Sequence, residues 1–144
     1  MRNATCCLLV VLFGSLSNSL GQKAPQFTTP QIVATYQRLN LTHEIRRTII
    51  YTPKDWGTFR ISLLMTLNVA NVKDANWIGA VRFENGGVRF AGPSIVINTG
   101  RRDFESSEVP IRAKADAPIT FSVTSTGETE NSKYSVFVVV EQLM

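Results

Sequence analysis

The chain of 144 residues has few of the side chains on which most enzymes rely. It contains one histidine, His43, and two cysteines, Cys6 and Cys7, both among the first ten residues. A structural zinc site needs four cysteine or histidine ligands, so the sequence excludes that class of site. A serine–histidine–acid triad would have to use His43, and no G-x-S-x-G motif accompanies it. We therefore expect a protein that is not an enzyme, with no catalytic residue, no metal and no cofactor.

Acidic residues are sparse, and their densest group lacks a recognisable site pattern. Asp103, Glu105 and Glu108 lie within six residues, but the D-x-D-x-D-G spacing of a calcium loop is missing. Arg101 and Arg102 directly precede them and offset their charge. We therefore interpret residues 101–108 as a solvated loop. A small hydrolase that uses two carboxylates of this group remains the third functional alternative.

An excess of charge of either sign is also missing. The chain has 15 basic and 11 acidic residues, a net charge of +4. This excess is too small to indicate nucleic-acid binding. The arginine pairs Arg46-Arg47 and Arg101-Arg102 would place their members on opposite faces of a strand, which divides the positive charge. We expect no nucleic-acid partner.

The first 21 residues have the order of a secretory signal peptide. Arg2 is followed by the apolar run Cys6–Phe13, and then by small and polar residues. Ser19 and Gly21 occupy positions −3 and −1 of a cleavage site before Gln22. The apolar run is too short for a membrane-spanning helix, which needs roughly 20 residues. We therefore expect a secreted protein, extracellular or periplasmic, with no stable membrane span after cleavage.

Removal of this segment changes the composition of what remains. Of the 144 residues 123 are left, with 14 basic and 11 acidic side chains, a net charge of +3 and no cysteine. A chain of this length can bury enough apolar surface without disulfides. We divide it into an extended lead-in, residues 22–44, and a β-sandwich domain, residues 45–144. The lead-in contains Pro25 and Pro30 and supplies an edge strand at residues 32–36.

The dominant pattern after the lead-in is alternation of apolar and polar residues. It is clearest in residues 59–69, where Phe59, Ile61 and Leu63 alternate with polar side chains. Period-two alternation indicates strands with one buried face, and no segment keeps the helical period. Further strands are expected at residues 45–51, 77–83, 88–90, 94–98, 109–115, 119–124 and 134–143.

Three local features refine this prediction. Asn85-Gly86-Gly87 indicates a hairpin turn, because these residues tolerate positive φ. Pro110 indicates that its strand lies at an edge or enters the sheet there, because proline cannot donate to a central ladder. Residues 134–143 are apolar on both faces, which predicts a central strand covered on both sides, whether by the second sheet or by a partner subunit. The fold class is therefore all-β, a two-sheet antiparallel sandwich of about eight strands.

Two stretches resemble the jelly-roll sandwiches of the C1q and tumour-necrosis-factor type, and the tips of phage tail fibres. They are Tyr51-Thr52-Pro53 with Gly57-Thr58-Phe59-Arg60-Ile61-Ser62, and residues 111–120, IRAKADAPIT. The chain is also similar to small secreted bacterial proteins of unknown function. The resemblance implies a compact sandwich, often trimeric, that works by binding, and it carries over no functional residue.

Two functional hypotheses lead over the hydrolase. The first is binding or self-assembly, with a protein or glycan partner or a homo-oligomer such as a trimer. The second is a carbohydrate-binding module that uses Trp56, which lies in a turn between Asp55 and Gly57. An exposed indole there would be a ligand contact, whereas a packed one would close the end of the sandwich. Asn40-Leu41-Thr42 is a glycosylation sequon, relevant in a eukaryotic host.

Overall fold

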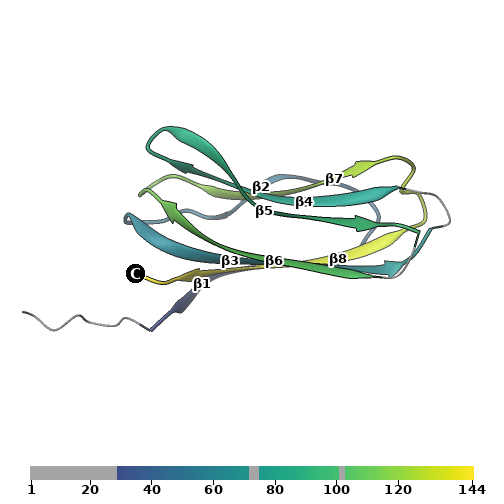
Figure 1. Ribbon diagram of the computed structural model, residues 1–144, viewed down its shortest axis with the longest axis horizontal. Coiled ribbons are helices and arrows are strands. Elements are labelled where there is room, and N and C mark those ends of the chain that lie inside the picture. Colours follow the sequence, from purple (N-terminus) through teal and green to yellow (C-terminus); the bar gives the residue numbers. More distant parts are fainter. Residues whose placement is uncertain (1–28, 72–74, 101–102) are drawn as a thin grey trace, which may run out of the picture.

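The computed structural model describes residues 29–71, 75–100 and 103–144, and these form two antiparallel sheets of four strands each. Sheet I has the order β1-β8-β3-β6 and sheet II the order β2-β7-β4-β5. The two sheets lie face to face as separate layers (Figure 1). The strands are β1 (Gln31–Leu41), β2 (Ile45–Tyr51), β3 (Gly57–Val69), β4 (Asn76–Asn85), β5 (Val88–Asn98), β6 (Phe104–Ala113), β7 (Ile119–Thr126) and β8 (Lys133–Gln142).

This strand order is that of a jelly roll. The chain passes from one sheet to the other at almost every connection, and only β4 and β5 follow each other within one sheet. The first and last strands pair in sheet I, and β2 pairs with β7 in sheet II. Eight strands wound in this way over two packed sheets define the jelly-roll architecture. The predicted all-β, two-sheet antiparallel sandwich is confirmed.

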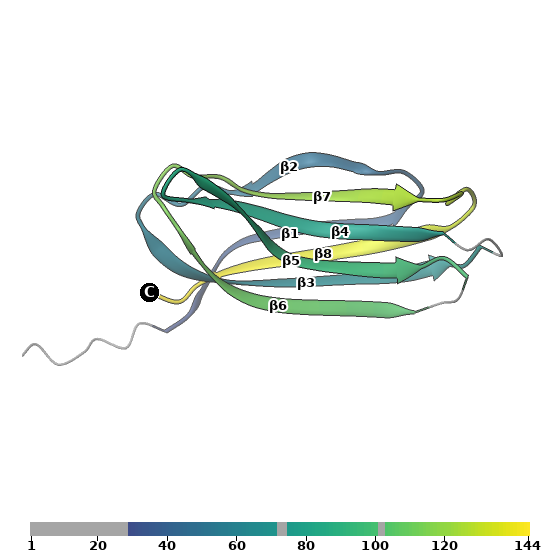
Figure 2. The ribbon, with the colours of Figure 1, turned by 45° about the horizontal axis from the view of Figure 1, so that its top comes forward.

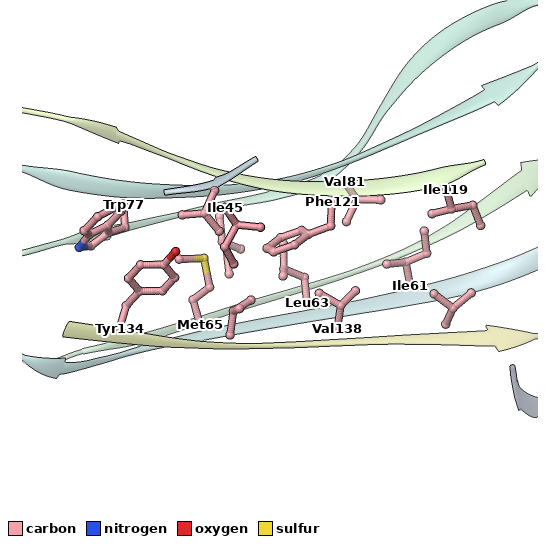
Figure 3. Close-up of a cluster of buried hydrophobic side chains, with 14 of the residues drawn as sticks. Ile45, Ile61, Leu63, Met65, Trp77, Val81, Ile119, Phe121, Tyr134 and Val138 are labelled. Carbon is pink, nitrogen blue, oxygen red and sulfur yellow. The ribbon is translucent and has the colours of Figure 1, made fainter. Parts of the chain in front are cut away.

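The core lies between the sheets and has the side chains that alternation predicted. In β3 every odd-numbered residue from Gly57 to Leu67 is buried, while the even-numbered residues are half-buried on the opposite face. Figure 3 shows side chains of β3 and β8 meeting those of sheet II across the core. Trp77 is fully buried and lies on the same face of β4 as the buried Val81. The largest fully buried side chains are Trp77, Tyr134, Phe59, Phe121, Ile61, Leu63 and Met65.

The residues before Ile45 contribute more to the sandwich than expected. β1 runs over Gln31–Leu41 and pairs with β8 at the edge of sheet I, so the predicted edge strand is present and longer. The sandwich therefore begins at least at Gln31 and not at Ile45. Half of this strand escaped prediction because its residues are exposed on both faces and do not alternate. The expected signal peptide, residues 1–21, lies outside the described residues.

Two further expectations need correction. Residues 88–90 and 94–98 form one strand, β5, because its pairing with β4 resumes after a register shift between Ala80 and Arg82. The solvated loop expected at residues 101–108 is wrong from Phe104 onward, where β6 begins and pairs with β3. In both cases the local composition is typical of a turn or loop. The residues nevertheless form a strand, because they pair with a neighbouring strand over a long stretch.

Three other predictions agree with the structure. Gly86 and Gly87 form the β4–β5 turn with φ of 64° and 82°. Pro110 lies in β6, which is an edge strand of sheet I. β8 is central in sheet I, between β1 and β3, and its Val136 and Val138 point into the core.

The connection between β1 and β2 is tied to β7 through one carboxylate. Glu44 accepts hydrogen bonds from the Ser125 backbone N–H at 2.8 Å and from the Ser125 hydroxyl at 2.9 Å. Both bonds favour the ionised form and lower the pKa of Glu44 below 4.5.

We expect this group to contribute stability above pH 4.5 that is lost as the pH falls through the lower pKa of the folded state. An NMR titration of the Glu44 carboxyl carbon should give a pKa below 4.5. In a Ser125→Ala variant, which removes the hydroxyl donor, that pKa should rise toward 4.5. A wild-type value at or above 4.5 would contradict the bonded geometry.

Candidate functional site

The candidate site is the outer face of sheet I, the face turned away from the core. The register across β8, β3 and β6 aligns the outward side chains of these strands in rows. Phe137, Leu64 and Ser106 form one row, and Val139, Ser62 and Glu108 form the next. β1 extends the rows with Gln37 beside Phe137 and Thr35 beside Val139.

The centre of this face is apolar. Leu64, Phe137 and Val139 are half-buried neighbours on β3 and β8, and they line a shallow hollow of about 530 Å³ with Ser62, Ser106 and Glu108. An antiparallel sheet whose outer face meets water would carry polar side chains there. β8 departs from that rule, because its apolar residues point both into the core and out of it. The sequence predicted a strand that is apolar on both faces. Its outward side chains, Phe137 and Val139, are not covered by the other sheet.

Further apolar side chains surround this centre. Phe104 on β6 is 66% exposed, and it is the register partner of outward-facing Thr66. Ile32 on β1 is 64% exposed and lies opposite Glu141. The apolar side chains therefore come from all four strands of sheet I. We call the set Ile32, Leu64, Phe104, Phe137 and Val139 the apolar face.

A small ionic group borders the apolar face on one side. The Nε atom of Arg60 donates to Oε2 of Glu141 at 2.5 Å, and Nη1 lies 3.7 Å from Oε1 of Glu108. The bond to Glu141 raises the pKa of Arg60 above its ordinary value, and the nearby charges of Glu141 and Glu108 act in the same direction. One arginine between two carboxylates leaves a net negative rim beside a neutral centre.

Trp56 lies where the chain enters β3, just before Gly57. Its side chain is 58% exposed, so the indole does not close the end of the sandwich by packing. The guanidinium carbon of Arg112 lies 5.8 Å from the centre of the indole ring, a cation–π contact. Arg112 is the register partner of outward-facing Thr58, which places it on the outer face of sheet I.

The acidic residues considered for hydrolysis do not come together. Glu108 faces outward opposite Ser62, while Glu105 pairs with Met65, whose side chain is buried in the core. Since neighbouring residues of a strand alternate between faces, these two carboxylates leave β6 on opposite sides. His43 is exposed, and its backbone oxygen accepts a hydrogen bond from the hydroxyl of Tyr134 at 2.9 Å.

The described ranges contain neither a cluster of metal ligands nor a helix that could span a membrane. Within residues 29–71, 75–100 and 103–144, no three histidine, aspartate or glutamate side chains cluster to hold a metal ion. In the same ranges no helix has the length and apolar character needed to cross a membrane.

Comparison with known proteins yields structural neighbours and no family. No family model matches the chain, and no curated protein matches it. A structure of Eiger TNF from S. frugiperda aligns with 79% of this chain and 94% of its own length, at 10% identity and a TM-score of 0.47. A structure of Bacillus endospore appendages, described as disulfide-linked pili, covers 99% of this chain and 98% of its own, at 17% identity and a TM-score of 0.34. The neighbours of this β-sandwich therefore include a TNF-like protein, as the sequence resemblance led us to expect, and a pilus protein.

Proposed function

We propose that the chain is an exported, non-enzymatic β-sandwich that assembles with further copies of itself through the apolar face of sheet I. The observation that carries the proposal is the uncovered, half-buried group of Leu64, Phe137 and Val139 at the centre of that face. Contiguous apolar surface of this kind marks sites of association, because it gains free energy when it leaves water.

The character of the face favours a second copy as the partner. Its centre is neutral, so copies that meet there, as a closed dimer or around a threefold axis, bring no like charges together at that centre. The ionic group of Arg60, Glu108 and Glu141 lies beside the centre, where charges remain hydrated and set the orientation of association. The sequence resemblance to C1q- and TNF-type jelly rolls makes a trimer the expected assembly.

The test uses the chain produced with its own N-terminal segment and recovered after export. Mass spectrometry should find a mature protein that begins at Gln22. Size-exclusion chromatography with light scattering should then give a mass of two or more chains, with three expected. A protein that remains a monomer at all concentrations would contradict assembly, and a protein that retains residues 1–21 inside the cell would contradict export.

A second function, carbohydrate binding, is supported by the exposure of Trp56. An exposed indole beside an arginine is suited to stack on a sugar ring and to meet its polar groups. On a glycan array, binding by this route should be lost in Trp56→Ala and kept in Val96→Ala, which removes an exposed apolar side chain from sheet II. Absence of binding, or binding unchanged in Trp56→Ala, would remove this alternative.

A further inference from the structure

The β4–β5 hairpin extends beyond the rest of sheet II. Pairing of β4 with β7 ends at Arg82 and Thr120, whereas pairing of β4 with β5 continues to Asn85 and Val88. Residues 83–90 therefore form a two-stranded ribbon without a third strand. Figures 1 and 2 show this ribbon curling away from its layer at one end of the sandwich.

The ribbon exposes apolar side chains that the fold does not use. Val88 is 57% exposed beside the glycine turn, and Phe90 is 43% exposed. Phe90 stacks on Phe83, with ring centres 5.5 Å apart and an angle of 19° between the planes. Phe83 in turn packs against the core, so the exposed aromatic stands on a rigid support.

Arginines lie beside this apolar tip. On the ribbon they alternate with Phe83, Val88 and Phe90 and so point to its other face, where Glu84 is the register partner of Arg89. Arg82 and Arg89 lie on the ribbon, and Arg47 on neighbouring β2 donates from Nε to the Thr120 hydroxyl at 3.0 Å. All three are exposed. Among the residues that the structure describes, the ion pairs within 4.0 Å both belong to Arg60, on the other sheet. The single acid on the ribbon, Glu84, leaves the group with a net positive charge.

A shallow hollow of about 300 Å³ lies at the base of the ribbon and is lined by Arg47, Ile49, Phe83, Glu84, Arg89, Pro118 and Thr120. Its walls combine two guanidinium groups and one carboxylate with apolar carbon. Guanidinium groups bind phosphate oxygens with paired hydrogen bonds, and exposed apolar side chains gain free energy when they enter the hydrocarbon boundary of a bilayer.

We propose that the β4–β5 hairpin docks the protein on an anionic lipid surface. The arginines contact lipid phosphates while Val88 and Phe90 enter the interface. A soluble polyanion would satisfy the arginines but would leave the apolar tip in water, so the combination favours a lipid surface. The hairpin belongs to sheet II and the apolar face to sheet I, so docking and assembly are independent.

Sedimentation with lipid vesicles tests the proposal on the full chain as recovered after export. We expect binding to phosphatidylcholine vesicles that contain about one third phosphatidylglycerol, no binding to pure phosphatidylcholine, and weaker binding as salt is raised. Each basic residue near an anionic membrane contributes about a fivefold gain in affinity, so Arg82→Gln/Arg89→Gln should bind about 25-fold more weakly. Val88→Ser should bind about three- to tenfold more weakly, because it removes apolar contact alone.

The matched control is Lys133→Gln, which removes one exposed positive charge at the start of β8, at the opposite end of the sandwich (Figure 2). Its affinity should stay within about twofold of the wild type, because charges beyond the roughly 10 Å Debye length of the surface are screened. Absence of binding to the anionic vesicles overturns the proposal. The proposal is also overturned if wild type and Val88→Ser bind the anionic vesicles equally and the protein binds soluble dextran sulfate tightly. In that case the ligand of the arginines would be a soluble polyanion. Far-UV circular dichroism of each variant establishes that it is folded.

Discussion

Replacing Trp77 by alanine is expected to lower the free energy of unfolding by about 3–5 kcal/mol. The side chain is 1% exposed and lies at one end of the core, where its ring centre is 4.6 Å from that of Tyr134 (Figure 3). Its Nε1–H donates to the Ser132 hydroxyl at 2.9 Å, which holds the polar β7–β8 connection against the core. Truncation removes the packing, leaves a cavity and leaves Ser132 with one partner fewer. Urea denaturation followed by circular dichroism measures the loss.

Two variants separate packing from hydrogen bonding at this position. Ser132→Ala keeps the indole but leaves its buried N–H without this acceptor, which should cost about 1–3 kcal/mol. Trp56→Ala removes the same side chain from an exposed position, and its effect should stay within about 0.5 kcal/mol. A loss for Trp77→Ala no larger than that for Trp56→Ala would contradict the assigned core.

The core could be predicted from the sequence because burial in a sandwich repeats every two residues. In β3 the apolar residues at 59, 61, 63, 65 and 67 are the buried ones, and Trp77 is buried in the same phase as Val81. The pattern is local and strict, because a shift of one residue in register would point all these apolar side chains toward the solvent. The strand Ile45–Tyr51 also agrees with its predicted bounds.

Edge strands were less predictable. The residues Phe104–Glu108 mix charged and polar side chains, and most of them are exposed. They are strand because β3 offers them a ladder, from Thr66 opposite Phe104 to Gly57 opposite Ala113. β1 escaped full prediction in the same way. Composition carries little signal where neither face of a strand is buried.

The apolar face required the strand order as well as the alternation. Leu64 interrupts the polar side of β3, and taken by itself it reads as an isolated exception. Its neighbours Phe137 and Ser106 are far away in the chain and become adjacent only because β8 and β6 flank β3. The one hint in the sequence was the two-faced apolar character of residues 134–143, which indicated a covering partner without saying where it would sit.

Replacing Leu64 by glutamate should therefore separate the assembled protein into monomers. Leu64 lies between Phe137 and Ser106 at the centre of the apolar face, so association would bury a carboxylate in every copy. An unpaired or like charge at such a position costs several kcal/mol, which weakens association by at least about 100-fold. The fold itself should be kept, because the side chain is half-buried on the outer face and does not contribute to the core. Light scattering after size-exclusion chromatography measures the change in mass.

The matched control is Val96→Glu on β5. Val96 is also apolar and outward-facing, and it is 52% exposed, but it lies on sheet II between the buried residues Ile95 and Ile97. The same change of charge there should leave the assembly intact, because sheet II turns its outer face away from the proposed contact. Dissociation by Val96→Glu alone would move the interface to sheet II, and an assembly unaffected by Leu64→Glu would exclude the apolar face. We expect Leu64→Glu to dissociate the assembly and Val96→Glu to leave it unchanged. The two variants add the same charge and differ only in the sheet that carries it, so this result would place the contact on sheet I.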